Sequence, residues 1–169
     1  VAALGDVLAR TGRDGEAQLQ YDTVGLIGRL AEINKAVYNR ELVLFYAAHN
    51  IRAGEALRLA HAEIAVRQDV YGYDALAWAL YRNGRAVEAA DAIERALSLG
   101  TPDASFHFHA GLIYHALGRE AEAQTALETA LGINPHFSLL EADRARATLA
   151  AIKLDADRDL AVAHSGPGG

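Results

Sequence analysis

Apolar residues recur with helical spacing along most of the chain. Leu76, Ala77 and Leu80, for example, stand at i, i+1 and i+4, which places them on one face of a helix. The alternation of apolar and polar residues that marks a half-buried strand is absent. The pattern therefore predicts an all-α chain of about nine helices without a strand.

Two segments of the sequence align without a gap when one is shifted by 34 residues. The shift superimposes residues of the same type, namely Gly84 on Gly118, Arg85 on Arg119 and Glu88 on Glu122. Each segment consists of two helical patterns joined at the glycine. A helix is expected to end there, because glycine adopts the left-handed conformation of a helix cap without steric cost.

The same frame extends upstream. Gly12 takes the turn position of a first copy, and Asn50 takes it in a second copy, where asparagine tolerates the left-handed conformation better than most residues. Pro102 and Pro135 each follow a second helix, which must end before the proline. The sequence is therefore divided into four predicted helix pairs, at about residues 1–33, 37–69, 70–103 and 104–137.

A last helix is predicted after the fourth pair. Ser138 and Glu141 have the spacing of a capping box, which predicts a capping helix at residues 139–154. This helix should cover the apolar face of the fourth pair, since terminal repeats need a cap, and it completes an array over residues 1–154. Residues 155–169 are polar, end in SGPGG and are expected to form a tail.

These features together resemble the tetratricopeptide repeat (TPR) family: the 34-residue period, the turn glycine, the small residues where helices meet and the proline after the second helix. One departure is that Tyr73 and His107 stand where the family has an early tryptophan. The resemblance implies a right-handed superhelix of antiparallel helix pairs (a TPR solenoid), with a concave groove lined by the first helix of each pair. It also implies binding of peptides or other proteins, which is what most family members do.

Within the family, the chain resembles the C-terminal part of longer bacterial TPR proteins. It begins at Val1, without a methionine, inside a predicted helix. We therefore expect it to be a piece of a longer array. Small residues are expected to let paired helices approach closely, with Ala77 and Gly111 on the first helices and Ala89 and Ala123 on the second ones.

The resemblance also implies which residues line the groove. In the third and fourth pairs we expect an aromatic and polar set made up of Tyr71, Asp74, Trp78, Tyr81, Arg82, Phe108, His109, Leu112 and His115. Further groove positions are Ala2, Ala3, Asp6, Ala9, Arg10, Arg40, Glu41, Leu44, Ala47, Ala48, Ala75, Ser105 and Ala116. Aromatic anchors beside a few charges are typical of a binding hot spot, which centres the predicted peptide-binding groove on Trp78. In the alternative interpretation, Trp78 only packs against Leu44 or Leu112 of the neighbouring helices.

The charge, the length of apolar runs and the absence of cysteine exclude several classes of partner and chemistry. Lysine and arginine number 16 against 22 aspartates and glutamates, which gives a net charge of −6 and argues against a nucleic-acid backbone as the main partner. No apolar run approaches the roughly 20 residues of a membrane-spanning helix, so no membrane insertion is expected. The absence of cysteine excludes disulfides and thiolate chemistry.

The sequence offers no catalytic or metal-binding motif. His107 and His109 are two residues apart, about 200° around a helix, so their side chains diverge. No two of the seven histidines are separated by three residues, and the ligand set of a zinc site is missing. A phosphate-binding loop and a nucleophile elbow are also absent from the sequence. We predict no enzyme activity, no cofactor and no metal.

The leading hypothesis is a non-catalytic module that holds a peptide or partner protein in its groove. The alternatives are a structural or self-associating segment of a larger repeat protein, and an accessory domain to a catalytic domain elsewhere in the parent chain. Exposed concave aromatics favour binding, whereas mutually packed ones favour a scaffold. Val1, Leu4, Val7 and Leu8 should leave apolar surface at the N-terminal end, which predicts a homo-oligomer through that end or coverage by a preceding repeat.

Overall fold

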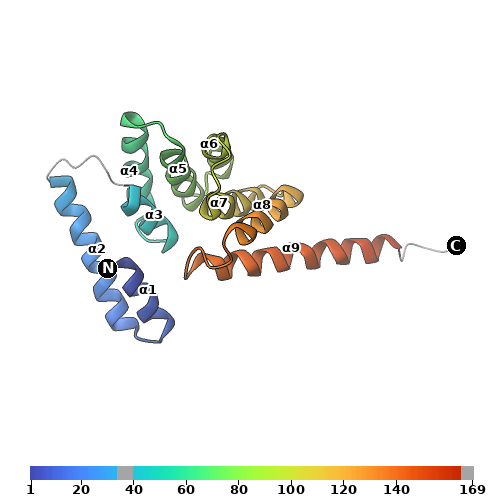
Figure 1. Ribbon diagram of the computed structural model, residues 1–169, viewed down its shortest axis with the longest axis horizontal. Helices are drawn as coiled ribbons and strands as arrows, with labels where there is room; N and C mark the ends of the chain where they lie inside the picture. Colours follow the sequence, from blue (N-terminus) through green and yellow to red (C-terminus); the bar gives the residue numbers. More distant parts are fainter. Residues whose placement is uncertain (34–39, 165–169) are drawn as a thin grey trace.

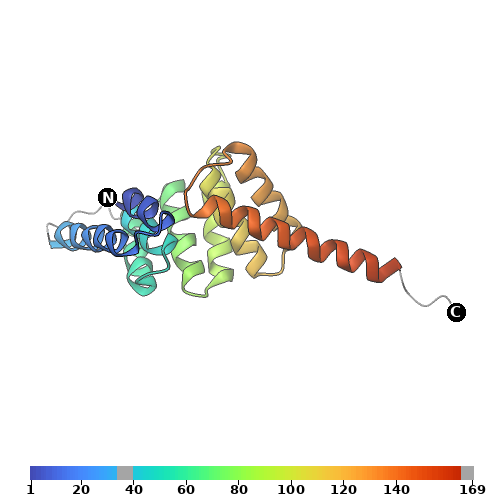
Figure 2. The ribbon, with the colours of Figure 1, turned by 90° about the horizontal axis from the view of Figure 1, so that it is seen from below.

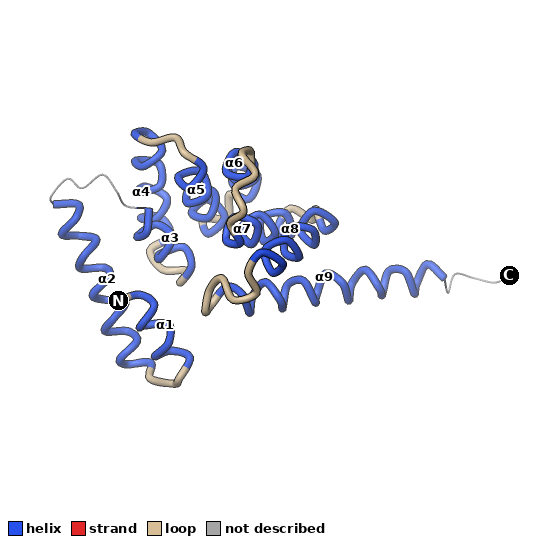
Figure 3. The backbone as a smooth tube through the Cα atoms, in the orientation of Figure 1, coloured by secondary structure: helices blue, strands red, loops and turns tan. Residues whose placement is uncertain are grey.

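The computed structural model describes the backbone of residues 1–33 and 40–164 and the side chains of residues 1–30 and 40–158. Within these ranges the chain forms nine α-helices and no strand, as predicted (Figures 1 and 3). The helices are α1 (Ala2–Arg10), α2 (Asp14–Ile33), α3 (Arg40–Ala48), α4 (Ala53–Val66), α5 (Val70–Arg82), α6 (Ala86–Leu97), α7 (Ala104–Ala116), α8 (Glu120–Ile133) and α9 (Glu141–His164). The predicted start of the second pair, at residues 37–39, lies outside the described residues.

The turns inside the helix pairs repeat one local structure. Gly12, Gly84 and Gly118 all have φ between 71° and 75°, and Asn50 has φ of 53°, so the four predicted left-handed positions are confirmed. In each glycine turn, the amide of the next residue donates a hydrogen bond back to the last turn of the preceding helix, as from Arg85 to Leu80 O at 3.0 Å. This bond satisfies a carbonyl that the helix end would otherwise leave open.

Consecutive helices pack as antiparallel pairs, and small residues set their separation. Ala77, Ala89 and Ala123 are fully buried. A Cβ atom added at Gly111 would lie 2.6 Å from Leu127 Cγ and 3.3 Å from the Ala123 carbonyl oxygen, which shows how closely α7 approaches α8. The predicted role of small residues at these seams is therefore confirmed.

The last helix caps the array but is longer than predicted. It buries Ala142, Ala145 and Ile152 against the fourth pair, and it then continues past Leu154 to His164, projecting beyond the other helices (Figures 1 and 2). The prediction that a tail begins at residue 155 was wrong. Residues 155–158, the last whose side chains the structure describes, are exposed, and residues 155–164 contain no glycine or proline that would end the helix.

The first helix pair contacts α3 and the start of α9 through individual side chains. The ring of Tyr21 on α2 lies 4.6 Å from the imidazole of His49, whose Nε2 is 2.7 Å from Asp6 Oδ1 on α1. On the other side, Arg10 Nη2 donates to Asp143 Oδ2 at 2.7 Å. The first pair therefore faces the start of α9 across the concave side of the array (Figure 1).

Candidate functional site

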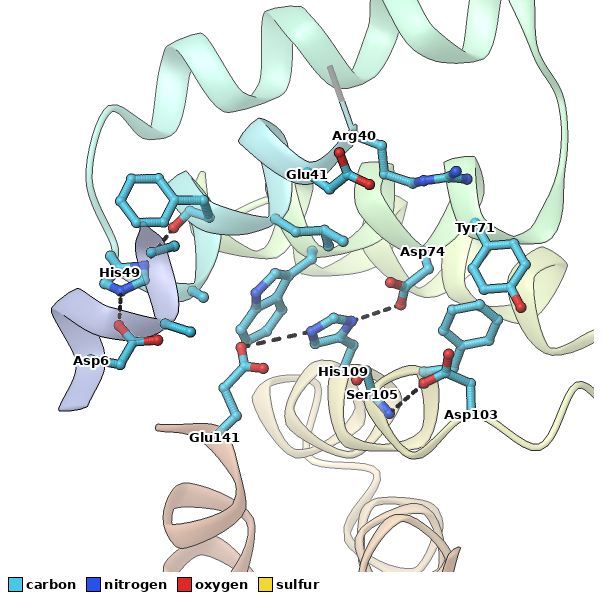
Figure 4. Close-up of a pocket in the computed structure, with 17 residues that line it drawn as sticks. Asp6, Arg40, Glu41, His49, Tyr71, Asp74, Asp103, Ser105, His109 and Glu141 are labelled. Atoms are coloured by element: carbon cyan, nitrogen blue, oxygen red, sulfur yellow. Dashed lines mark hydrogen bonds and ion pairs between the residues drawn. The ribbon is translucent and has the colours of Figure 1, made fainter. Parts of the chain in front are cut away.

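A cavity of about 480 Å³ opens on the concave side of the array. It is lined by α1, α3, α5 and α7, which are the first helices of the four pairs, and by Glu141 at the start of α9 (Figure 4). The lining residues are Ala2, Ala3, Asp6, Arg40, Glu41, Leu44, Phe45, Ala48, His49, Tyr71, Asp74, Trp78, Asp103, Ser105, Phe106, His109 and Glu141. The cavity thus lies on the first helices, where the sequence placed the groove, and its use as a binding groove stays a prediction.

A buried polar group lies at the floor of the cavity. His109 Nδ1 is 2.7 Å from Asp74 Oδ1, and both side chains are almost fully buried. On the other side of the ring, His109 Nε2 is 3.9 Å from Glu141 Oε1, so the imidazole lies between two carboxylates (Figure 4).

The protonation of this group follows from its surroundings. Burial alone would lower the pKa of His109, but the carboxylates of Asp74 and Glu141 outweigh it and raise the pKa to about 9. Burial also raises the pKa of Asp74, and the adjacent histidine only partly offsets this effect. The pair therefore holds a proton at neutral pH.

Trp78 lines the cavity, but it is not an exposed anchor. Its side chain is fully buried, with the ring of Tyr81 stacked at 5.0 Å, that of His109 at 4.3 Å and the edge of Phe108 at 5.6 Å. The guanidinium of Arg82 lies 4.5 Å from the indole centroid. The Trp78 ring is therefore not an open aromatic surface for a ligand. It is enclosed by the side chains of Tyr81, Arg82, Phe108 and His109.

The other predicted groove residues divide into two groups. Tyr71, Asp74, Trp78 and His109 line the cavity, and among them Tyr71 is the most exposed at 44%. Those outside its lining are Tyr81, Arg82, Phe108, Leu112 and His115. Eight of the further predicted positions also line it: Ala2, Ala3, Asp6, Arg40, Glu41, Leu44, Ala48 and Ser105.

The residues outside the lining have structural contacts instead. Phe108 and Leu112 are buried in the core. Arg82 donates from Nε to Ala47 O at 2.6 Å and from Nη2 to Ala48 O at 3.1 Å, which caps the carbonyl end of α3. His115 is exposed and contacts Glu120 at 2.8 Å.

Sequence reasoning missed the contribution of Glu141. The capping box identified it only as a helix-start residue, and Ser138 Oγ does accept a hydrogen bond from the Glu141 amide at 3.2 Å. Its side chain, however, extends into the cavity toward His109 (Figure 4). Other unpredicted lining residues are Phe45, His49, Asp103 and Phe106. A helix-start signal carries no information about which neighbour the side chain meets.

Two buried polar atoms at the cavity have no hydrogen-bond partner among the described residues. The indole Nε1 of Trp78 and Oε1 of Glu141 are both buried, and neither forms a hydrogen bond. Buried polar groups in native proteins are nearly always satisfied, so unpaired ones call for an explanation. Both belong to residues that line the same cavity.

The described residues contain no cluster of three or more potential metal ligands. Within the same ranges, no helix is both long enough and apolar enough to cross a membrane. The cavity has carboxylates, imidazoles, aromatic rings and a guanidinium, which together are suited to recognition by charge and hydrogen bonding.

Comparison with known proteins identifies one repeat. Residues 104–137, which contain α7 and α8, match the family model of the tetratricopeptide repeat. No curated protein and no solved structure matches the chain. The fourth helix pair is therefore a tetratricopeptide repeat, and the described helices form a TPR-like array of consecutive pairs.

Proposed function

We propose that this chain is a non-catalytic interaction module that binds a peptide segment of a partner protein in the cavity on its concave side. The tetratricopeptide repeat at residues 104–137 suggests a protein partner in general terms. The observation that carries the more specific proposal is the cavity itself, where four first helices and α9 converge around two unpartnered polar atoms. A bound peptide is a ligand that can supply hydrogen-bond partners to both.

The accessible part of this site is its rim. Tyr71 is partly exposed, meets Phe106 edge to face with the ring centroids 5.3 Å apart, and lies under the guanidinium of Arg40 at 5.3 Å. These contacts restrict the ring before a ligand arrives, which lowers the entropy cost of binding. Tyr71 therefore replaces Trp78 as the aromatic side chain that a ligand meets first.

The test is selection of a randomised peptide library on the wild-type chain, followed by titration of the enriched peptides. Trp78 is the only tryptophan in the sequence and lines the cavity, so its fluorescence reports binding there. We expect Tyr71→Ala to weaken binding by about 2 kcal/mol, the effect of removing a hot-spot residue.

Tyr73→Ala is the matched control, because Tyr73 lies on the same helix but contacts Arg95 outside the cavity. Thermal melting of both variants separates a binding effect from a folding effect. Equal affinity of the two folded variants and the wild type would contradict the proposal.

One observation favours a second candidate, the structural scaffold. The concave aromatics Trp78, Tyr81 and Phe108 pack against one another, as expected for an array that only continues a larger assembly. The two candidates differ in the library experiment. A scaffold segment enriches no peptide and shows no change in Trp78 fluorescence.

A further inference from the structure

We propose that the cavity selects a basic side chain, lysine or arginine, of the bound peptide, with Glu141 as the main carboxylate that receives the cation. This inference rests on the proposed function. It assigns the chemical class of the group that enters the cavity.

The cavity carries an excess of negative charge. Five carboxylates line it, from Asp6, Glu41, Asp74, Asp103 and Glu141. The cationic groups in the lining are Arg40 and, when protonated, His109 and His49. A site walled by one sign of charge concentrates ligands of the opposite sign.

Three of these carboxylates are already satisfied within the protein. Asp74 pairs with His109, and Asp6 accepts from Tyr21 Oη at 3.0 Å and contacts His49 at 2.7 Å. Asp103 accepts from the Ser105 amide at 2.9 Å as the cap of α7. These three carboxylates add negative charge to the cavity, but each already accepts a hydrogen bond within the protein.

Glu141 and Glu41 are not satisfied in this way. Glu141 Oε1 is buried without a hydrogen bond, and its nearest cationic atom, His109 Nε2, is 3.9 Å away, beyond hydrogen-bond distance. Glu41 is exposed at the rim and has no ion pair among the described residues. Arg40 next to it pairs with Asp69 instead, at 3.3 Å. The cavity therefore has one deep carboxylate whose Oε1 has no hydrogen-bond partner, at Glu141, and one rim carboxylate without an ion pair among the described residues, at Glu41.

The aromatic lining is compatible with a cation. At the rim, the guanidinium of Arg40 already lies 5.3 Å from the centroid of the Tyr71 ring, so this aromatic surface accommodates a cation. At the floor, Trp78 has an unpartnered indole N–H, and the acceptor it lacks is an oxygen such as a peptide carbonyl. A peptide residue with a basic side chain provides both a cation and a carbonyl. Since both unpartnered atoms are covered in the free structure, entry requires a small adjustment of the floor, which Trp78 fluorescence would report.

The experiment uses the randomised peptide library on the whole chain and on Glu141→Gln. We expect peptides enriched by the wild type to carry lysine or arginine at one fixed position. Replacing that residue by glutamine should weaken binding tenfold or more (about 1.4 kcal/mol), measured by titration of Trp78 fluorescence. On Glu141→Gln, the preference for a basic residue should fall by a similar factor.

Two further variants keep the result interpretable. Glu94→Gln removes the same charge from an exposed position on α6 outside the cavity, and it should bind like the wild type. Glu41→Gln changes an exposed rim residue without touching the buried histidine, so it tests the charge preference even if Glu141→Gln unfolds.

The outcomes distinguish failure of the preference for a basic residue from failure of peptide binding itself. Enriched peptides without a basic residue, bound equally by wild type, Glu141→Gln and Glu41→Gln, would overturn the basic preference and leave peptide binding intact. If no peptide is enriched and Trp78 fluorescence never changes, the proposed function itself fails.

Discussion

His109 connects three helices through its imidazole ring. It belongs to α7, pairs with Asp74 on α5, faces Glu141 on α9 and stacks on Trp78. Its pKa of about 9 lies above the value of roughly 6.5 for a histidine in an unfolded chain. The folded protein therefore binds this proton more tightly than the unfolded one.

This pKa difference predicts how stability depends on pH. The contribution of His109 is fully present below about pH 6.5 and is lost as pH rises through about 9, because a raised folded-state pKa favours folding only while the group is protonated. We expect the free energy of unfolding to fall by the order of 1–3 kcal/mol across that window. Chemical denaturation at several pH values measures it.

His109→Gln should remove most of this dependence, whereas His136→Gln, at an exposed histidine, should retain it. His107 acts in the opposite direction, since burial lowers its pKa and its contribution is lost as pH falls. An unchanged slope between pH 6.5 and 9 in His109→Gln would assign the effect to other groups.

The second prediction for a single residue concerns how Trp78 contributes to folding stability. Its ring is fully buried among Tyr81, Phe108 and His109, so Trp78→Ala should cost about 3–5 kcal/mol of folding stability. Trp78→Phe should cost less, because it keeps an aromatic ring and removes the unpartnered N–H. Urea denaturation checks both variants, and a loss below about 1 kcal/mol for the alanine variant would mean that the ring is accessible in solution.

The residue-level predictions were correct where they depended on local conformation and failed where they depended on contacts between residues far apart in the sequence. Gly12, Gly84 and Gly118 could be assigned from sequence because a left-handed turn is a local conformational requirement. The burial of Trp78 could not, since it depends on Arg82 and His109 meeting around the ring. The same limit applies to Glu141, whose role depends on where α9 docks.

At the scale of elements, replacing two glycines on the paired helices α7 and α8 by alanine should change stability in opposite directions. A Cβ at Gly111 would lie 2.6 Å from Leu127 Cγ, whose side chain is fully buried and cannot move away freely. Gly111→Ala should therefore destabilise the fourth pair by about 1–3 kcal/mol through overpacking, less whatever the gain in helix propensity offsets.

Gly132 in α8 is the matched control. No atom lies within 4 Å of an added Cβ there, so Gly132→Ala should leave packing unchanged and stabilise the helix by up to about 1 kcal/mol. Thermal melts of the two variants should shift in opposite directions. A stabilised Gly111→Ala would show that α7 and α8 can separate without cost.

Helix α9 shows why element boundaries were less predictable than element types. The apolar spacing that identifies its first half ends near Leu154, where the helix leaves the fourth pair. Residues 155–158, the next ones whose side chains are described, are exposed, and the pair of Arg158 with Asp155, at 3.3 Å, supports the helix there. A search for apolar spacing does not detect a helical segment whose side chains are exposed.

At the scale of the whole molecule, the repeat period predicted the architecture of the second, third and fourth pairs, because these pairs pack on one another in the same order, α4 against α5 and α6 against α7. It did not predict how the first pair meets α9, since Arg10 and Asp143 are far apart in the sequence. The cavity is lined by carboxylates from α1, α3, α5, the N-cap of α7 and the start of α9. The candidate site is therefore a property of the array, which single-repeat patterns do not describe.

The first pair also leaves an apolar surface at the N-terminal end of the array. Val1, Leu4 and Val7 are about half exposed, as predicted, while Leu8 is buried against its neighbours. On α2 a second exposed set lies on the face opposite the buried Ala17: Leu19, Leu26, Ile27 and Leu30. Exposed apolar patches of several hundred Å² on soluble proteins are commonly interaction sites.

We predict that this surface associates with a second copy of the chain. Light scattering across a concentration series should then show a mass that rises above that of the 18.1 kDa monomer. A double variant, Leu26→Glu with Leu30→Glu, should shift the protein toward monomer, because it places charges on the exposed face of α2 without entering the core. Val87→Glu is the control, since Val87 is exposed on α6 away from this face and its change should leave the mass unaltered. A wild-type chain that stays monomeric at high concentration would contradict self-association and favour coverage of this face by a different partner segment.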